Sequence, residues 1–155
     1  MRSRTYFTYR TPYGPLTIGG ERERIYRVAL GHLAFEGERR PSAATNACAD
    51  QLLEYFAGKR TSFTVDLLVE GTLFQKEVWQ AIGDIPYGQV RTATHIAHVI
   101  GRPNANRAVG QAVSSNPLAI LIPAHRVTSA SGRTVDTDRA AQLRAALRKL
   151  ERSFA

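Results

Sequence analysis

The sequence has one cysteine, Cys48, among its 155 residues. An internal disulfide is therefore excluded, and a lone thiol is typical of a protein from a reducing compartment. No apolar run approaches the roughly 20 residues that a membrane-spanning helix needs. The N-terminus also has no apolar signal region. We therefore expect a cytoplasmic protein without membrane association, located at the nucleoid if the source is bacterial.

Acidic residues are missing from a long central stretch. Between Asp84 and Asp136 there is no Asp or Glu, although Arg91, Arg102, Arg107, Arg126 and Arg133 all fall there. The net charge of +8 is therefore unevenly distributed, with a purely basic stretch between Asp84 and Asp136. A positive field of this kind favours binding of a polyanion, and DNA is the common one. Charge alone leaves a soluble basic protein with solvated arginines as an equally open interpretation. A glycine-rich phosphate-binding loop is also absent, which argues against nucleotide hydrolysis.

An apolar content of 43% is enough for a packed core in one domain or two small ones. In the first part of the chain, β-forming residues and alternation predict strands over 5–9, 16–18, 25–30 and 63–67. Apolar residues at helical spacing predict a helix from Ala43 to Ala57, which Gly58 ends.

The second part of the chain has a helical pattern. Apolar spacing predicts helices over 74–82, 93–100, 105–113 and about 137–152. We expect Thr92 to cap the second of these helices and Asn104 to cap the third. Two helices joined by a short glycine-containing turn are typical of a helix-turn-helix, but taken alone the pattern favours two packed core helices.

Five short segments decide between these interpretations. They are Phe74-Gln75-Lys76-Glu77-Val78-Trp79, Ile85-Pro86-Tyr87-Gly88, Arg107-Ala108-Val109-Gly110, Asn116-Pro117 and Ile122-Pro123-Ala124-His125-Arg126-Val127. In this order and spacing they resemble the O6-alkylguanine-DNA alkyltransferases (methylated-DNA–protein-cysteine methyltransferases), which repair a base by transferring its alkyl group to their own cysteine. The resemblance covers nearly the whole chain.

The resemblance implies an α+β fold. A small α/β N-terminal domain is expected over residues 1–68. A mostly helical, winged-helix-like DNA-binding domain with the helix-turn-helix is expected over residues 69–155.

The sequence departs from this family at the nucleophile. The family's reactive segment reads Pro-Cys-His-Arg-Val, and Ala124 stands at the cysteine position, where a methyl side chain cannot accept an alkyl group. In the family, a residue matching Asn116 stabilises the reactive turn, and a histidine matching His125 links through water to a carboxylate that matches Glu151. We expect these residues to be remnants that keep the turn in shape, and the chain to be an inactive homologue and not an enzyme.

The resemblance also implies a DNA-binding surface. In the family the second helix of the helix-turn-helix enters the minor groove, and an arginine matching Arg107 replaces the flipped-out base. Guanidinium suits this role because it is planar, permanently charged and able to stack. The small residues Ala105 and Asn106 let the helix approach the groove. The remaining expected DNA contacts are Thr92, Ala93 and Arg126.

The expected lesion pocket consists of Pro123, Ala124, Val127, Thr137 and Ala93. The family has tyrosines at the positions of Ala93 and Thr137, so this pocket should be wide. A wide pocket predicts a preference for guanines with bulky substituents over O6-methylguanine.

Three functions remain open at this point. The favoured one is a non-enzymatic, alkyltransferase-like protein that recognises alkylated or bulky-modified guanine by base flipping and flags it for excision-repair proteins. The alternatives are an active alkyltransferase with an engineered Cys→Ala change at the nucleophile, and a general or regulatory DNA-binding protein without lesion recognition. We expect a monomer with no cofactor and no metal, since His95 and His98 lack an evident third ligand.

Overall fold

The computed structural model describes residues 3–129 and 139–155. The chain divides into two compact units. The first consists of Met1–Glu70 with Pro117–Leu121, and the second of Gly71–Asn116 with Ile122–Ala155. The expected division after residue 68 lies close to the observed change at Gly71. The return of 117–121 to the first unit was not expected.

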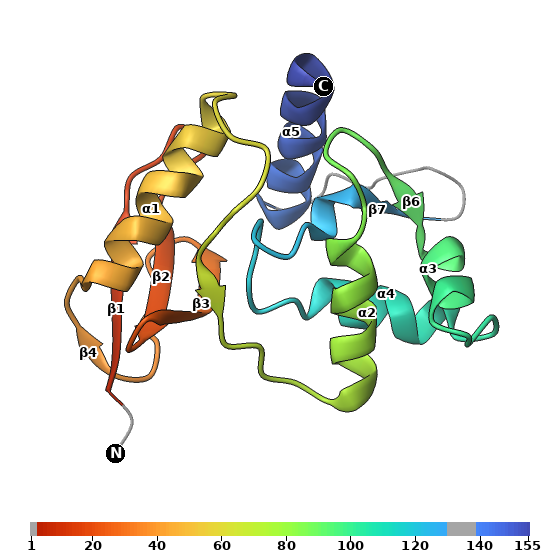
Figure 1. Ribbon diagram of the computed structural model, residues 1–155, viewed down its shortest axis with the longest axis horizontal. Coiled ribbons are helices and arrows are strands. Elements are labelled where there is room, and N and C mark those ends of the chain that lie inside the picture. The colour runs from red at the N-terminus through yellow and green to blue at the C-terminus, as the bar shows by residue number, and fades with distance from the viewer. Residues whose placement is uncertain (1–2, 130–138) are drawn as a thin grey trace. The chain divides into compact units, whose positions relative to one another are not determined.

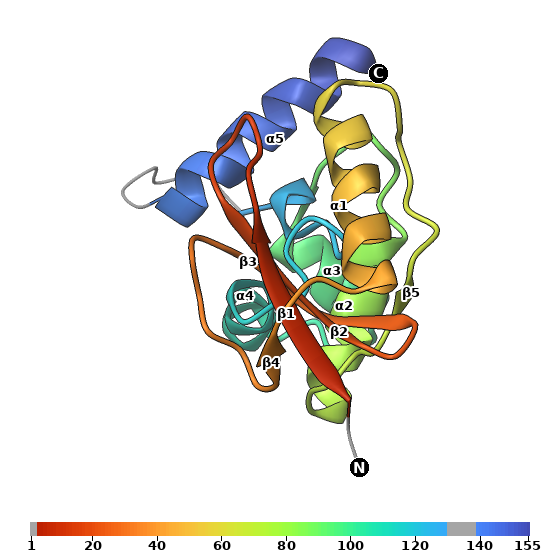
Figure 2. The same cartoon turned by 90° about the vertical axis from the view of Figure 1, so that its left-hand side faces the viewer.

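The first unit is built on a five-stranded sheet with strand order β4-β1-β2-β3-β5. Its centre is an antiparallel meander of β1 (Arg4–Tyr9), β2 (Leu16–Glu21) and β3 (Arg24–Leu30). The edge strands β4 (Glu38–Arg39) and β5 (Asp66–Leu67) pair in parallel with β1 and β3. Helix α1 (Ala43–Phe56) lies along one face of the meander, as Figures 1 and 2 show.

The strands and the helix predicted for this unit are confirmed to within a few residues, with one exception. The strand expected over 63–67 is wrong in extent, because only Asp66–Leu67 pairs with the sheet. Ahead of it, Thr64 is tied to Gln51 of α1: the Thr64 backbone N–H donates to Gln51 Oε1 at 2.9 Å. This segment therefore bonds to the helix before it reaches the sheet edge.

The segment Pro117–Leu121 lies against β3. The Val28 N–H donates to the Pro117 carbonyl at 2.9 Å, and the Ala119 N–H donates to the Val28 carbonyl at 3.1 Å. The side chains of Leu118 and Ile120 are buried. This apolar run is therefore fixed in the first unit immediately before the chain enters the segment that carries Ala124.

The second unit combines four α-helices in its described residues with one pair of two-residue parallel strands. They are α2 (Leu73–Gly83), β6 (Arg91–Thr92), α3 (Ala93–Val99), α4 (Asn106–Ser114), β7 (Val127–Thr128) and α5 (Arg139–Phe154). Trp79 of α2 is buried and donates its indole N–H to the Ala112 carbonyl of α4 at 2.8 Å. The expected α+β fold class is confirmed. No helix in the described residues is long and apolar enough to cross a membrane.

The two predicted helix caps had different outcomes. Thr92 caps α3 as expected, since its hydroxyl accepts the His95 backbone N–H at 3.1 Å. Asn104 was the wrong cap, because α4 begins two residues later at Asn106 and its N-cap, Ala105, makes no side-chain cap bond. The physical reason is the turn before α4, which the Ala105 N–H closes by donating to the Arg102 carbonyl at 3.0 Å.

Candidate active site

The residues that carry Ala124 form a short, buried turn. We call Ile122–Val127 the 124 turn; its centre is a 3-10 helix, η1 (Ala124–Arg126). The Arg126 N–H closes it by donating to the Pro123 carbonyl at 2.9 Å. The side-chain amide of Asn116 donates to the Ile122 carbonyl at 2.8 Å, so Asn116 holds the entry to the turn. Ala124 is buried within it.

Glu151 of α5 binds the side chains of two residues of the 124 turn. Glu151 is buried, with 1% of the residue exposed. His125 Nε2 lies 2.6 Å from Glu151 Oε2, and Arg126 donates Nε to Oε1 at 2.8 Å and Nη2 to Oε2 at 3.0 Å. The resemblance placed a water between the histidine and the carboxylate. In this structure the two side chains are in direct contact.

The same carboxylate also holds the turn that precedes β6. The Gly88 backbone N–H donates to Glu151 Oε1 at 3.0 Å. Gly88 has a φ of +80°, and a Cβ at this position would lie 2.6 Å from the Cβ of Ala155. The positive φ favours glycine at this position, and a side chain would also crowd the C-terminal residue, Ala155. We refer to Glu151, His125, Arg126 and Gly88 as the Glu151 cluster.

The hydrogen bond to Glu151 determines the state of His125. An ionised carboxylate only accepts hydrogen bonds, so Nε2 of His125 must carry the proton that lies between them. Burial lowers the pKa of His125 below its ordinary value; the hydrogen bond to Glu151 opposes this, and the charges of Arg126 and Arg148 add to the lowering. The imidazole is therefore neutral near pH 7, with Nδ1 as its basic nitrogen.

Arg126 does not occupy the DNA surface that the sequence predicted for it. Its side chain is buried, and besides Glu151 it binds the Ile85 carbonyl through Nη1 at 2.8 Å. The guanidinium also lies over the ring of Tyr87, 5.6 Å from its centroid. Because the guanidinium is buried and bound to these partners, it is not placed to meet a DNA phosphate, and its contribution is the charge that balances Glu151.

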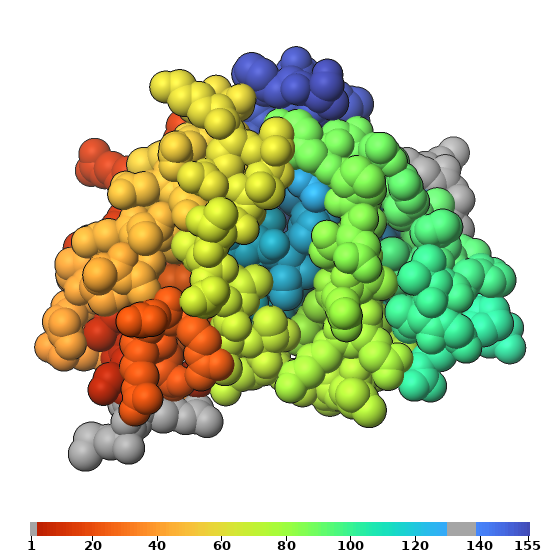
Figure 3. All heavy atoms as spheres, in the orientation of Figure 1, coloured from red at the N-terminus to blue at the C-terminus, as the bar shows by residue number. Residues whose placement is uncertain are grey.

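The predicted DNA-contacting residues of α3 and α4 lie at the start of those helices. Asn106 and Arg107 are exposed in the first turn of α4, while Ala105, Thr92 and Ala93 are partly buried. Among the described residues no ion pair engages Arg107. In the space-filling view of Figure 3 the chain between α3 and α4, coloured teal, is at the surface. Arg107 is therefore available to an external partner.

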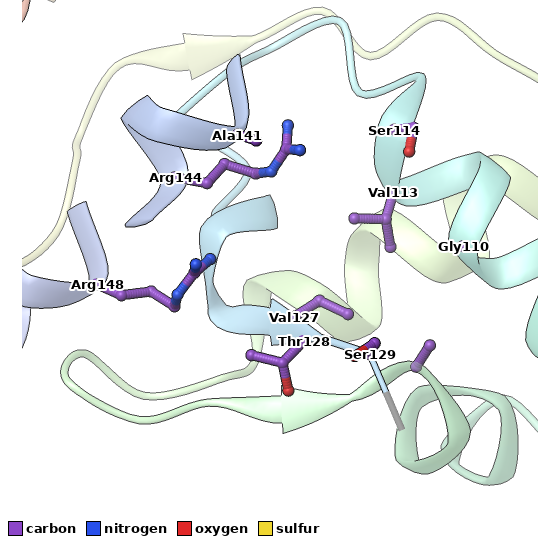
Figure 4. Close-up of a pocket in the computed structure, with 10 residues that line it drawn as sticks. Gly110, Val113, Ser114, Val127, Thr128, Ser129, Ala141, Arg144 and Arg148 are labelled. Carbon is purple, nitrogen blue, oxygen red and sulfur yellow. The ribbon is translucent and has the colours of Figure 1, made fainter. Parts of the chain in front are cut away.

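A pocket of about 280 Å³ opens between α4, β7 and α5. Ala93 and Val127, both expected in the lesion pocket, are on its wall. Pro123 and Ala124 are not among its lining residues, and Thr137 lies outside the described residues. Figure 4 shows Arg144 and Arg148 projecting from α5 on one side, opposite Val113 and Ser114 of α4. We call this cavity the α4–α5 pocket.

The sequence reasoning missed Arg148 as a support of the 124 turn. Arg148 is buried and donates Nη1 to the His125 carbonyl at 3.2 Å. Its position three residues before Glu151, on the same helix face, was the available signal.

Cys48 is not a substitute for a missing nucleophile. It is fully buried in α1 of the first unit, and burial raises its pKa to about 12. A thiol in this state is neutral at physiological pH, and thiols react as thiolates. In this environment Cys48 is therefore an inert thiol.

Both parts of the chain match one protein family. Residues 5–69 match the 6-O-methylguanine DNA methyltransferase, ribonuclease-like domain, and residues 73–153 match the 6-O-methylguanine DNA methyltransferase, DNA binding domain. The methylated-DNA–protein-cysteine methyltransferase of Mycobacterium tuberculosis is 41% identical over 155 residues, covering 97% of this chain and 93% of the relative. The protein of the same name from Methanosarcina acetivorans is 40% identical over 153 residues, covering 96% and 98%.

Solved structures show the same similarity. The crystal structure of M. tuberculosis O6-methylguanine methyltransferase matches with a TM-score of 0.90 at 39% identity, covering 98% of this chain and 94% of that one. The M. tuberculosis protein OGT in complex with DNA matches with a TM-score of 0.89 at 39% identity, covering 97% and 94%. The prediction that the chain is not an enzyme is contradicted, because proteins named as methyltransferases match it across both units.

The neutral state of His125 predicts how stability depends on pH. Because its pKa in the folded protein is lowered, the unfolded chain binds a proton first as the pH falls below about 6.5. The contribution of neutral His125 to the free energy of unfolding is complete above that pH. It is lost as the pH falls toward the pKa of His125 in the folded protein, by at most about 1.4 kcal/mol per pH unit. Denaturant unfolding followed by the fluorescence of Trp79, the only tryptophan, should show this loss.

The matched variants are His125→Gln, which keeps a donor for Glu151, and His98→Gln at an exposed position on α3. His125→Gln should flatten the pH dependence between about pH 7.5 and 5.5, whereas His98→Gln should leave it intact. An unchanged slope in His125→Gln would show that the imidazole is not held neutral by the fold.

Proposed function

Because this chain belongs to the 6-O-methylguanine DNA methyltransferase family, we propose that it is a DNA alkyltransferase whose acceptor position, residue 124, is occupied by alanine. It binds duplex DNA through α3 and α4, turns a modified guanine out of the helix and presents the O6 substituent to the 124 turn. The observation that carries this proposal is the intact Glu151 cluster around the 124 turn. A buried ionic cluster of this kind is expensive to keep when nothing depends on its geometry.

The reaction requires a cysteine at position 124. His125 Nδ1 takes the thiol proton, the thiolate sulfur attacks the alkyl carbon, a C–S bond forms and the C–O6 bond breaks. Guanine leaves with the bonding electron pair and takes up a proton. Ala124 supplies no electron pair, and Cys48 is buried and protonated. We therefore interpret Ala124 as a Cys→Ala replacement in an otherwise complete site.

DNA binding is supported by the acid-free stretch between Asp84 and Asp136 and by the start of α4. Arg107 is exposed in the first turn of α4, and the N-cap residue, Ala105, makes no side-chain hydrogen bond to the first backbone N–H groups of the helix. Positive helix termini and arginines both favour phosphate and base contacts. The similar M. tuberculosis OGT has been solved in complex with DNA. Arg107 is the residue that we assign to the space left by the flipped base.

We expect Ala124→Cys to accept one methyl group per protein molecule when it is incubated with a duplex that contains O6-methylguanine. The turn, His125 and Glu151 are already in place, and the change adds only the sulfur. Intact-protein mass spectrometry measures the transfer, and Ala124→Ser is the matched control with a poor nucleophile at the same position. Absence of added mass on Ala124→Cys would contradict the proposal, and would leave a DNA-binding protein of another function.

Arg107→Ala should weaken binding to an O6-methylguanine duplex by about tenfold or more, because one charged and stacked contact is lost. Binding of unmodified duplex should change less. The control is Arg152→Ala, at an exposed position of α5. Fluorescence anisotropy over a salt series measures both affinities. Equal affinities of Arg107→Ala and the unchanged chain for both duplexes would exclude the base-replacing role of Arg107.

A further inference from the structure

Helix α5 holds His125 at two points that lie about one helical turn apart. The carboxylate of Glu151 lies 2.6 Å from Nε2 of the His125 side chain. Arg148, three residues earlier on α5, donates Nη1 to the main-chain carbonyl of His125 at 3.2 Å. Residues i and i+3 lie on the same face of a helix. One face of α5 therefore binds both the side chain and the main chain of His125.

Arg148 carries a buried charge. Only 9% of the residue is exposed, and an arginine does not lose its proton in proteins. Burying a guanidinium costs more free energy than burying an apolar side chain, even when the guanidinium has hydrogen-bond partners. An uncharged residue of similar length could fill this position of α5 at a lower cost. The charge of Arg148 therefore calls for an explanation other than packing.

The surroundings of His125 act on its imidazole in opposite directions. Burial has the largest effect and lowers the pKa of His125. The hydrogen bond to Glu151 and the charge of Glu151 raise this pKa, whereas the charges of Arg126 and Arg148 lower it. Among the described residues, the two arginines are thus the groups whose charge opposes the carboxylate.

A histidine that takes a proton from a thiol must be neutral beforehand. A protonated imidazole donates from both ring nitrogens and has no acceptor left. A carboxylate at 2.6 Å favours that protonated form of His125. Arg126 opposes it, but its guanidinium is also the main partner of Glu151. Arg148 adds a second positive charge, and it reaches the turn through the main chain of His125.

From these contacts we infer that Arg148 is a positioning residue for the acceptor chemistry, which fixes the main chain of His125 and places a positive charge beside it, so that the imidazole stays a neutral base despite its carboxylate partner. The inference rests on the proposed function, since this base has a thiol to act on only when cysteine occupies position 124. A general base works best when its pKa lies near the working pH, and opposing charges set that value. Arg148 makes and breaks no bond in the transfer and acts through His125.

The test is a pH profile of methyl transfer in Ala124→Cys, with and without Arg148→Met. Methionine keeps a long, flexible side chain and removes the charge and the donor. Single-turnover rates at saturating O6-methylguanine duplex are measured by intact-protein mass spectrometry between about pH 5.5 and 8.5. Without the charge of Arg148 the acid limb should move upward by about 0.5 to 1 pH unit, which makes transfer roughly three- to tenfold slower at about pH 6. The rates at about pH 8.5 should agree, because His125 is neutral there in both proteins.

A rate that falls by the same factor at every pH would mean that Arg148 only supports the fold, and would overturn the inference. Arg148→Lys keeps a charge and a donor and should retain the acid limb of Ala124→Cys. Arg152→Met, on the exposed side of α5, should also leave it in place. Affinity for the duplex should be unchanged in Arg148→Met, because the residue is buried. A weakened affinity with an unshifted profile would assign Arg148 to DNA binding and would also overturn the inference.

The chain with Ala124 gives a second readout that needs no transfer. Removing the charge of Arg148 should raise the pKa of His125 in the folded protein toward the unfolded value of about 6.5. The loss of stability on acidification that neutral His125 produces should therefore be smaller in Arg148→Met than in the unchanged chain. An equal loss in the two proteins would show that the charge of Arg148 does not act on His125.

Failure of this inference is distinguishable from failure of the proposed function. If Ala124→Cys accepts the methyl group and Arg148→Met slows transfer equally at every pH, the proposed function stands and the inference fails. If Ala124→Cys accepts no methyl group, the proposed function fails, and the role of Arg148 in transfer fails with it, whatever the unfolding measurements show.

Discussion

The carboxylate of Glu151 joins three segments that are distant in the sequence, and the candidate site depends on it. Its two oxygens receive hydrogen bonds from the 124 turn, through His125 and Arg126, and from the backbone of Gly88. The carboxylate of a residue that is 1% exposed is stable only because these donors replace its water. Removing it would leave the buried Arg126 charge uncompensated, which typically costs about 3–5 kcal/mol. Glu151 therefore holds the 124 turn, α5 and the turn at Gly88 in one arrangement.

The sequence predicted those parts of the fold that depend on local patterns. Apolar spacing located α1, α2 and α5 to within a few residues, and the hydroxyl of Thr92 marked the start of α3. Local patterns could not show that Pro117–Leu121 belongs to the first unit, because that depends on backbone bonds to Val28. The start of α4 was misplaced because a turn closed by backbone groups took the place of an Asn104 cap.

The candidate site also contains residues that motif spacing could identify and residues whose partners are distant in the sequence. Motif spacing drew attention to His125, Asn116 and Glu151, and in the structure His125 contacts Glu151 while Asn116 binds the entry to the 124 turn. It misplaced Arg126, because a basic residue in an acid-free stretch was taken as a DNA contact and its long-range partner Glu151 is visible only in three dimensions. Ala124 at the nucleophile position favoured an inactive homologue, but similarity to methyltransferases extends over both units of the chain.

The central claim is that the Glu151 cluster keeps position 124 ready to activate an acceptor. The most direct measurement is a pH titration of the thiol in Ala124→Cys, made in a Cys48→Ala background and followed by the ultraviolet absorbance of the thiolate. Because a proton passed from the thiol to His125 forms an imidazolium that Glu151 stabilises, the account predicts a thiol pKa below the ordinary value of about 8.5, and a return toward that value when His125→Gln is added. A thiol that titrates at or above about 8.5 whether or not His125 is present would contradict the account.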